Sequence, residues 1–171
     1  MTNPQISPHA AAPEEARNTP ATRPAPRPVI WTLPGFCGTM RVTTSFGDLP
    51  LQALRVRDPL RTSDGNFAKV AWVDQVRLDE DFLSANPDAL PILLPAGCLG
   101  RNQPRVDLVT SPHQRLLVAS SDGQSAPRLA RDLLGRPGVV RKPAMSVTYT
   151  VFHCGALATI YIEGLPVTIA P

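Results

Sequence analysis

Three cysteines are the residues of this sequence that could most directly do chemistry, because an ionised thiol is a strong nucleophile and a metal ligand. They are Cys37, Cys98 and Cys154, in a chain of 171 residues. An odd number of cysteines without a secretion signal makes a disulfide framework unexpected and leaves at least one thiol free. The cysteines also lack the Cys-x-x-Cys spacing of a structural zinc site. Each thiol is therefore expected to react alone or simply to pack.

Two further groups of reactive side chains have a simpler interpretation. His153 and Cys154 are adjacent, so in a strand they face opposite sides and cannot work together as base and nucleophile. Asp79, Glu80 and Asp81 are adjacent carboxylates, which form a solvated loop more often than a cation site. We therefore predict no metal and no cofactor.

The composition excludes several classes of partner. The 17 Lys and Arg residues and 14 Asp and Glu residues give a net charge of only +3, and they are scattered, so no nucleic-acid partner is predicted. No apolar run approaches the ~18 residues of a membrane span. The start MTNPQISPHAAAPEE lacks the basic and apolar regions of a signal peptide. The default expectation is a cytoplasmic chain with no membrane partner, while an unidentified protein partner and the oligomeric state stay open.

The first 28 residues differ in texture from the rest of the chain. They hold seven of the 20 prolines and almost no large apolar side chains, so they cannot bury enough surface to offset the entropy of ordering. We predict a disordered Pro-rich leader at residues 1–28 and one domain at residues 29–171. The segment RPAPRP favours polyproline II, which makes the leader a stiff linker or, in a second interpretation, a ligand for a partner domain.

Turn signals divide the chain after Val29 into short strands. A β-branched run before Phe46-Gly47-Asp48 and an apolar stretch after it predict a hairpin. Ser63-Asp64-Gly65-Asn66 predicts a second hairpin, because Asp-Gly supplies the positive φ of a tight turn. We expect Trp72, on the strand that follows, to anchor the core.

Later segments continue this pattern. Residues 78–90 fit a loop or one helical turn, and APRLARDLLG, residues 126–135, is the one plausible helix. Residues 147–162, interrupted at His153-Cys154-Gly155, predict two paired core strands. Because strands follow strands with little helix to cover a sheet, the predicted class is all-β, closed or folded over, with at most one or two short helices.

Three phrases, in order, resemble the Hint (hedgehog/intein) domain family, in particular bacterial proteins of the alphaproteobacterial type. They are GTMRVTTSFGDLPLQALRVRDPLRTSDG, PAGCLGRNQPRVDLVTSPHQRLLV and IYIEGLP, within residues 35–166. The resemblance implies a compact β domain of short twisted strands with pseudo-twofold character. It also implies self-processing, in which a cysteine at the start of the domain attacks the preceding carbonyl. A histidine of a T/S-P-x-H or T-x-x-H element then assists the leaving amide nitrogen.

This chain departs from that pattern at both positions. The family places its cysteine four residues before Gly-Thr, where Pro34 stands, and its histidine where Gln114 stands. Cys37, Thr110 and His113 are the candidate replacements, with Cys37 cutting after Phe36. In a second interpretation Cys37 packs as a small apolar residue and Thr110 and His113 belong to a turn, since a shift of one residue in a strand turns a side chain to the opposite face.

Two functions follow from the resemblance. The first is a Hint domain with degenerate self-processing residues that acts as a non-catalytic scaffold or binding domain. The alternative is an autoproteolytic domain that cleaves its own chain near Cys37 by an N-S acyl shift. Protein splicing is not expected, because the sequence ends in Thr168-Ile169-Ala170-Pro171 without an asparagine to cyclise.

Overall fold

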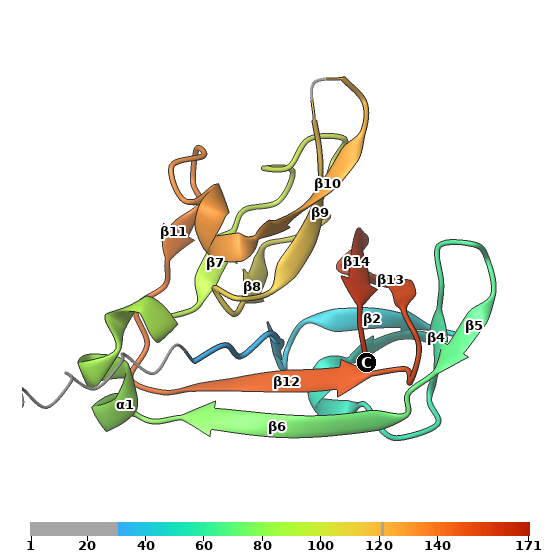
Figure 1. Ribbon diagram of the computed structural model, residues 1–171, viewed down its shortest axis with the longest axis horizontal. Coiled ribbons are helices and arrows are strands. Elements are labelled where there is room, and N and C mark those ends of the chain that lie inside the picture. The colour runs from blue at the N-terminus through green and yellow to red at the C-terminus, as the bar shows by residue number, and fades with distance from the viewer. Residues whose placement is uncertain (1–30, 121) are drawn as a thin grey trace, which may run out of the picture. The chain divides into compact units, whose positions relative to one another are not determined.

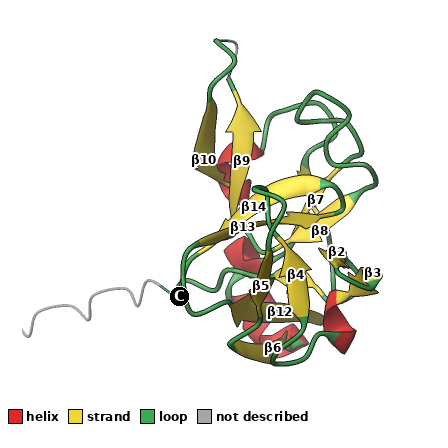
Figure 2. Ribbon diagram, turned by 90° about the vertical axis from the view of Figure 1, so that its right-hand side faces the viewer, coloured by secondary structure: helices red, strands yellow, loops and turns green. Residues whose placement is uncertain are grey.

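Short strands separated by tight turns make up most of the described chain (Figure 1, Figure 2). The computed structural model describes residues 31–120 and 122–171, so the leader expected at residues 1–28 lies outside the described residues. Both predicted hairpins are present. In the turn of the second, the Asn66 amide donates to the Asp64 carboxylate at 3.1 Å and Gly65 has a φ of 86°. These local interactions explain why the turn sequence predicted the reversal.

The described strands form three antiparallel sheets. The first has the order β11 (Val140–Arg141), β7 (Ile92–Leu94), β8 (Leu108–Thr110), β1 (Phe36–Cys37), β12 (Val147–His153) and β6 (Trp72–Leu78). The second has the order β14 (Leu165–Ile169), β13 (Ala158–Ile162), β2 (Arg41–Thr44), β4 (Pro59–Arg61) and β5 (Phe67–Lys69), with β3 (Gly47–Pro50) also paired to β2. The third is the hairpin of β9 (Arg115–Ala119) and β10 (Ser125–Leu129). In Figure 1 this hairpin projects away from the long pair β6 and β12.

Helical structure is confined to short segments. They are α1 (Glu80–Ala85) and the 3₁₀ turns η1 (Leu51–Ala53), η2 (Pro87–Ala89) and η3 (Ala130–Leu133). The acidic run at residues 79–81 begins α1, where the Asp79 carboxylate accepts a hydrogen bond from the Phe82 amide at 2.9 Å. Asp79 is therefore a helix cap, and the neighbouring carboxylates lie in the first turn, where negative charge is favourable.

Two apolar clusters form the core. The larger one joins the sheets through fully buried side chains such as Phe36 on β1, Val42 on β2 and Ile160 on β13. The smaller one surrounds Tyr149 on β12 and Leu83 on α1. β1 lies between β8 and β12: Phe36 pairs with both neighbours, while Cys37 pairs with β12. Because adjacent strand residues face opposite ways, the two contribute to different clusters.

The prediction of two paired strands within residues 147–162 is wrong in its pairing. The two strands exist as β12 and β13, but they belong to different sheets. β12 pairs along its whole length with β6, and β1 occupies the middle of its other edge at Tyr149 and Thr150. The chain turns at Gly155, which has a φ of 75°, and continues into the second sheet.

Two smaller expectations are also corrected. Trp72 does not anchor the core: its side chain is 43% exposed, because β6 is an edge strand and the indole stacks on His153 at the surface. The helix expected at residues 126–135 is not formed as one element: residues 126–129 belong to β10, which pairs with β9, and residues 130–133 form the 3₁₀ turn η3.

The all-β prediction, with at most short helices, is confirmed. The helices found among residues 31–120 and 122–171 are all too short to cross a bilayer.

Candidate functional site

The short strand β1 brings the start of the domain beside the segment Thr110–Gln114. Phe36 pairs with Thr110 on one side and Thr150 on the other. Gly35 allows this approach, since a Cβ at that position would lie 2.9 Å from the Thr150 carbonyl oxygen. Any larger residue would clash with backbone that cannot easily move. The sequence around Gly35 is thus held in one place by two neighbouring strands.

Hydrogen-bond donors gather on two carbonyls of this segment. The buried Ser111 hydroxyl donates to the carbonyl oxygen of Leu33. The Ser111 amide donates to the Gly35 carbonyl oxygen at 2.9 Å, and the Thr110 hydroxyl donates to that same oxygen at 2.8 Å. Such donors would stabilise negative charge on a carbonyl oxygen under attack. The carbonyl that Ser111 holds is the one that immediately precedes Pro34.

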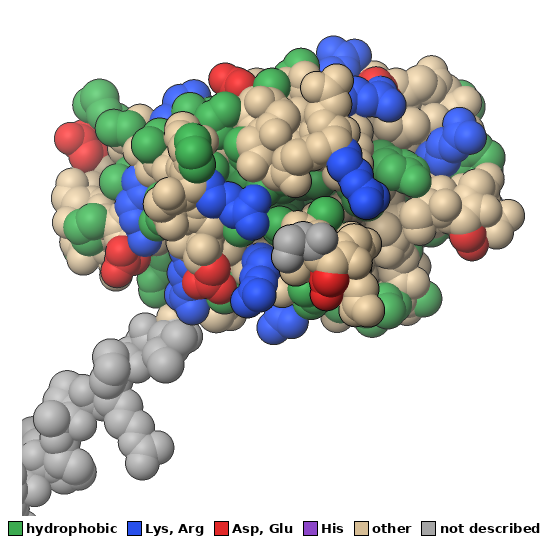
Figure 3. All heavy atoms as spheres, turned by 90° about the horizontal axis from the view of Figure 1, so that it is seen from above, with side chains coloured by type: hydrophobic (Ala, Val, Ile, Leu, Met, Phe, Trp, Pro, Cys, Tyr) green, Lys and Arg blue, Asp and Glu red, His purple; other side chains and the backbone are tan. Residues whose placement is uncertain are grey.

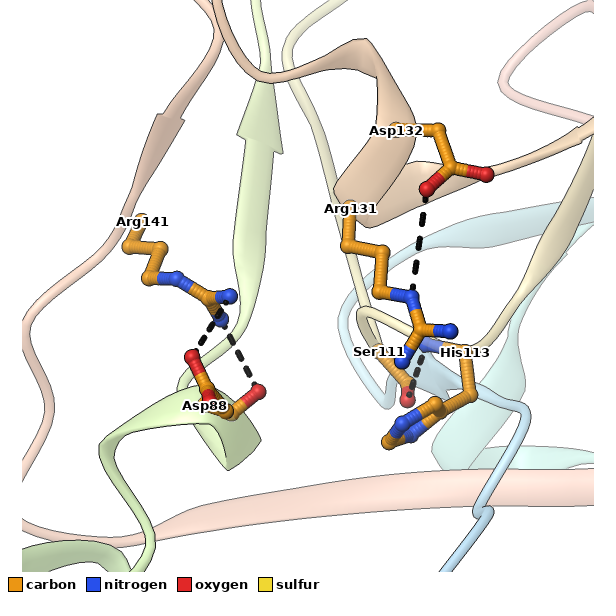
Figure 4. A network of polar contacts seen from close by, with 6 residues as sticks. All are labelled: Asp88, Ser111, His113, Arg131, Asp132 and Arg141. Atoms are coloured by element: carbon orange, nitrogen blue, oxygen red, sulfur yellow. Dashed lines mark hydrogen bonds and ion pairs between the residues drawn. The ribbon is translucent and has the colours of Figure 1, made fainter.

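His113 lies beside these donors but faces Trp31. The two rings meet edge to face with centroids 4.5 Å apart, and the His113 amide donates to the Ser111 hydroxyl oxygen at 3.2 Å. Figure 4 shows Arg131 reaching from η3 toward His113 and Ser111. Burial, and then the charges of Arg131 and Arg141, lower the pKa of the His113 imidazole. His113 is therefore neutral at pH 7.

Gln114 is buried in the same turn. Its side chain is 4% exposed, and its Nε2 donates to the Arg115 carbonyl oxygen at 2.9 Å. A carboxamide neither releases nor takes up a proton near neutral pH. The position therefore offers hydrogen bonds but no general acid or base.

Cys37 points to a different part of the molecule. It packs against the cluster around Tyr149, with which it is paired across β1 and β12. It lines a cavity of about 420 Å³ that also contains Lys142 and Gln75. Burial raises the pKa of the Cys37 thiol to about 11, and Lys142 offsets that rise only in part. Adjacent residues in a strand face opposite ways, and Phe36 accordingly contributes to the other cluster.

A larger cavity of about 530 Å³ adjoins the Ser111 turn. Its lining includes Pro34, His113, Gln114, Arg131 and Thr150. Of the three residues predicted from the sequence, His113 alone lines this cavity, Thr110 lies on β8 with its hydroxyl on Gly35, and Cys37 lines the other cavity. The structure brings Thr110 and His113 to one turn and places Cys37 outside it.

A metal ion would need a group of acidic, histidine or cysteine side chains. In the part of the chain that the structure describes, no three such side chains are grouped for that purpose. Cys98 and Cys154 are half-buried free thiols whose pKa burial raises.

The sequence matches the model of the Hint domain over residues 34–168. The chain belongs to the Hint domain family. Its fold is similar to the MchDnaB-1 intein, with 11% identity over 77% of this chain and 98% of that chain and a TM-score of 0.50. A variant of that intein matches with 14% identity over 79% and 99% and a TM-score of 0.50. None of the curated proteins matches this sequence.

In this Hint domain the matched region begins at Pro34, the position where the family resemblance places the attacking cysteine. Leu33 then carries the carbonyl that such a cysteine would attack. Sequence reasoning did not name Leu33 and Ser111 among the candidate site residues. The signal for Ser111 was its place in the Ser-Pro element, but only the fold shows that its hydroxyl reaches a residue 78 positions away.

Proposed function

We propose that this Hint domain is a non-catalytic scaffold or binding domain with degenerate self-processing residues. The observation that supports the proposal most directly concerns the Leu33 carbonyl and the residue that follows it. The Ser111 hydroxyl hydrogen-bonds to the Leu33 carbonyl oxygen, but the next residue, Pro34, has no nucleophilic side chain that could attack this carbonyl. Thioester formation requires a nucleophile at this point.

The environment of Cys37 supports the same proposal. With a pKa of about 11, roughly one thiol in ten thousand is ionised at pH 7. The thiolate is the reactive form. Cys37 also lines a different cavity from His113 and His153, so neither of these two described histidines is placed to assist departure of the Cys37 amide.

A second candidate function is self-cleavage after Phe36 by an N-S acyl shift. In that reaction the Cys37 thiol gives its proton to the departing amide nitrogen, its sulfur bonds to the Phe36 carbonyl carbon, and the amide C–N bond breaks. The resulting thioester still joins the chain, which separates when an added thiol attacks the same carbonyl carbon and the C–S bond to Cys37 breaks. One observation favours it: Lys142 lines the same cavity as Cys37 and lowers the pKa of the thiol against the effect of burial.

Intact mass spectrometry of freshly expressed protein separates the two functions. We expect a single full-length species, unchanged by added dithiothreitol, both in the parent and in a Cys37→Ala variant. A Cys98→Ala variant is the matched control for loss of a half-buried thiol. A thiol-dependent product beginning at residue 37, present in the parent and absent from Cys37→Ala, would overturn the scaffold proposal in favour of self-cleavage.

A further inference from the structure

The cavity beside Pro34 holds polar groups that the fold itself does not use. In the described part of the chain, two buried side-chain polar atoms have no hydrogen-bond partner, His113 Nδ1 and Thr150 Oγ1. Both residues line this one cavity. Buried polar groups in proteins nearly always have a partner, so their convergence here points to a group that enters the cavity.

Both polar atoms are held in fixed positions. Thr150 is fully buried on β12, where it is paired with Phe36 and Gln75. His113 is fixed by its contact with Trp31, and as a neutral imidazole it offers one donor and one acceptor. Both atoms are covered in this structure, so a ligand would reach them only after a local shift of the side chains that cover them.

The charge of the lining specifies the ligand further. Arg115 and Arg131 line the cavity, and none of the described side chains in its lining is acidic. Arg131 Nε lies 3.9 Å from Asp132 Oδ1, and both side chains are about half exposed. This ion pair is therefore weak and leaves guanidinium N–H donors free. His153 adds a donor: its Nδ1 accepts a hydrogen bond from the Gly155 amide at 3.0 Å, which leaves the proton on Nε2.

The face of the molecule seen in Figure 3 has a different charge pattern from the cavity lining. Figure 3 shows one face of the molecule, on which Lys and Arg side chains recur with acidic side chains between them. The cavity lining instead combines cations with apolar walls from Phe36, Leu129 and Ile169. Its volume of about 530 Å³ is in the range of small-ligand sites.

We propose that this cavity binds a carboxylate joined to an apolar body, of the size of one or two residues of an apolar peptide C-terminus. A planar carboxylate matches the fork of a guanidinium, whereas a phosphate dianion would be costly to place against apolar walls. Thr150 and His113 provide the remaining hydrogen bonds. This inference rests on the proposed binding function and specifies what is bound.

The test is a nuclear magnetic resonance titration of the full chain with N-acetyl-Leu-Phe. We expect it to shift the amide signals of residues 150–153 and to bind at least about tenfold more tightly than its C-terminal amide, since charged hydrogen bonds are the stronger ones. A third arm uses 3-phenylpropionate. Weaker binding of this acid identifies a peptide end as the source of the carboxylate, and equal binding identifies a free acid; either result supports the proposed ligand chemistry.

Variants locate the binding. Arg131→Gln is expected to weaken binding of the acid about tenfold and to leave binding of the amide unchanged. Arg128→Gln, which removes an exposed arginine of β10 outside the cavity, is the matched control and is expected to change neither. Thr150→Val is expected to weaken binding severalfold without lowering the stability of the free protein, because it removes a hydroxyl that has no partner.

Equal affinity for acid and amide, or full affinity in Arg131→Gln, would overturn the proposal. The mass spectrum of the same sample keeps the two proposals apart. If the chain is cleaved but still binds the acid more tightly than the amide, the non-catalytic function is contradicted and the binding site is supported. If the chain is intact but binds acid and amide equally, only the proposed binding site is contradicted.

Discussion

Pro34 and Gln114 separate this Hint domain from the self-processing chemistry that the family resemblance implies. We expect the double variant Pro34→Cys and Gln114→His to gain thiol-dependent cleavage between Leu33 and residue 34. The Leu33 carbonyl is already held by Ser111, so the missing parts are a nucleophile and an acid. The measurement is the appearance of a fragment starting at residue 34 in the mass spectrum after dithiothreitol is added.

The single variants apportion this effect. Pro34→Cys alone is expected to cleave about 10²–10⁴ times more slowly, the usual contribution of a general acid or base. Gln114→His alone should give no fragment. A double variant that also carries Ser111→Ala is expected to lose most of its rate, and full activity there would show that the hydrogen bond to Leu33 plays no part.

The thiol of Cys37 gives a prediction on pH. Its folded pKa of about 11 lies above the ordinary value of 9.0, so at pH 8 iodoacetamide should alkylate it about 100 times more slowly than an exposed peptide thiol. The rate should rise about tenfold for each increase of one in pH up to about pH 11. Peptide mapping after timed labelling measures it. A rate that levels off near pH 8 would contradict the burial of this thiol.

At the scale of elements, β12 is tied to η2 by one buried hydrogen bond. The Tyr149 side chain is fully buried, and its hydroxyl donates to the Ala89 carbonyl oxygen at 3.2 Å. Tyr149→Phe leaves that carbonyl unpaired, which we expect to lower the free energy of unfolding by about 1–3 kcal/mol. Urea unfolding measures the change. The control is Tyr161→Phe, which changes the other tyrosine of the chain, half-buried on β13. An equal loss of unfolding free energy in both variants would refute the role of the Tyr149 hydrogen bond.

Elements that depend on neighbouring residues could be predicted, and those that depend on distant ones could not. The hairpin turn at Asp64-Gly65 is encoded by its own residues, so the sequence pattern located it. Whether β13 pairs with β12 depends on β1 and β6, which pair with the two edges of β12. The sequence of residues 147–162 alone does not show that these other strands bind there. Trp72 was misjudged for the same reason, because only the sheet order makes β6 an edge.

The same limit applied to the candidate site. The sequence showed that Cys37 and His113 are displaced from the family positions, but not which cavity each side chain lines. The family resemblance supplied the fold and the two altered positions, Pro34 and Gln114. The hydrogen bond from Ser111 to Leu33 joins distant parts of the chain and needed the structure.

For the whole molecule, both apolar clusters are built from residues of the unit Trp31–Pro171. We propose, as the sequence predicted, that the domain begins at residue 29, and we expect it to be stable without residues 1–28. A chain starting at Val29 should unfold within about 2 °C of the full chain in differential scanning calorimetry. A decrease of more than about 5 °C, equivalent to roughly 1 kcal/mol in a domain of this size, would assign a structural role to residues 1–28.

The central place of β1 has a consequence for the order of folding. This strand has only two residues, and both its neighbours, β8 and β12, come from far along the chain. Contacts of high sequence separation close large loops and form late. We therefore expect the Leu33 carbonyl to meet Ser111 only after the chain has been synthesised beyond residue 111 and these strands have begun to pair. Any chemistry once performed on that carbonyl would have been delayed, by chain topology alone, until the domain was folded.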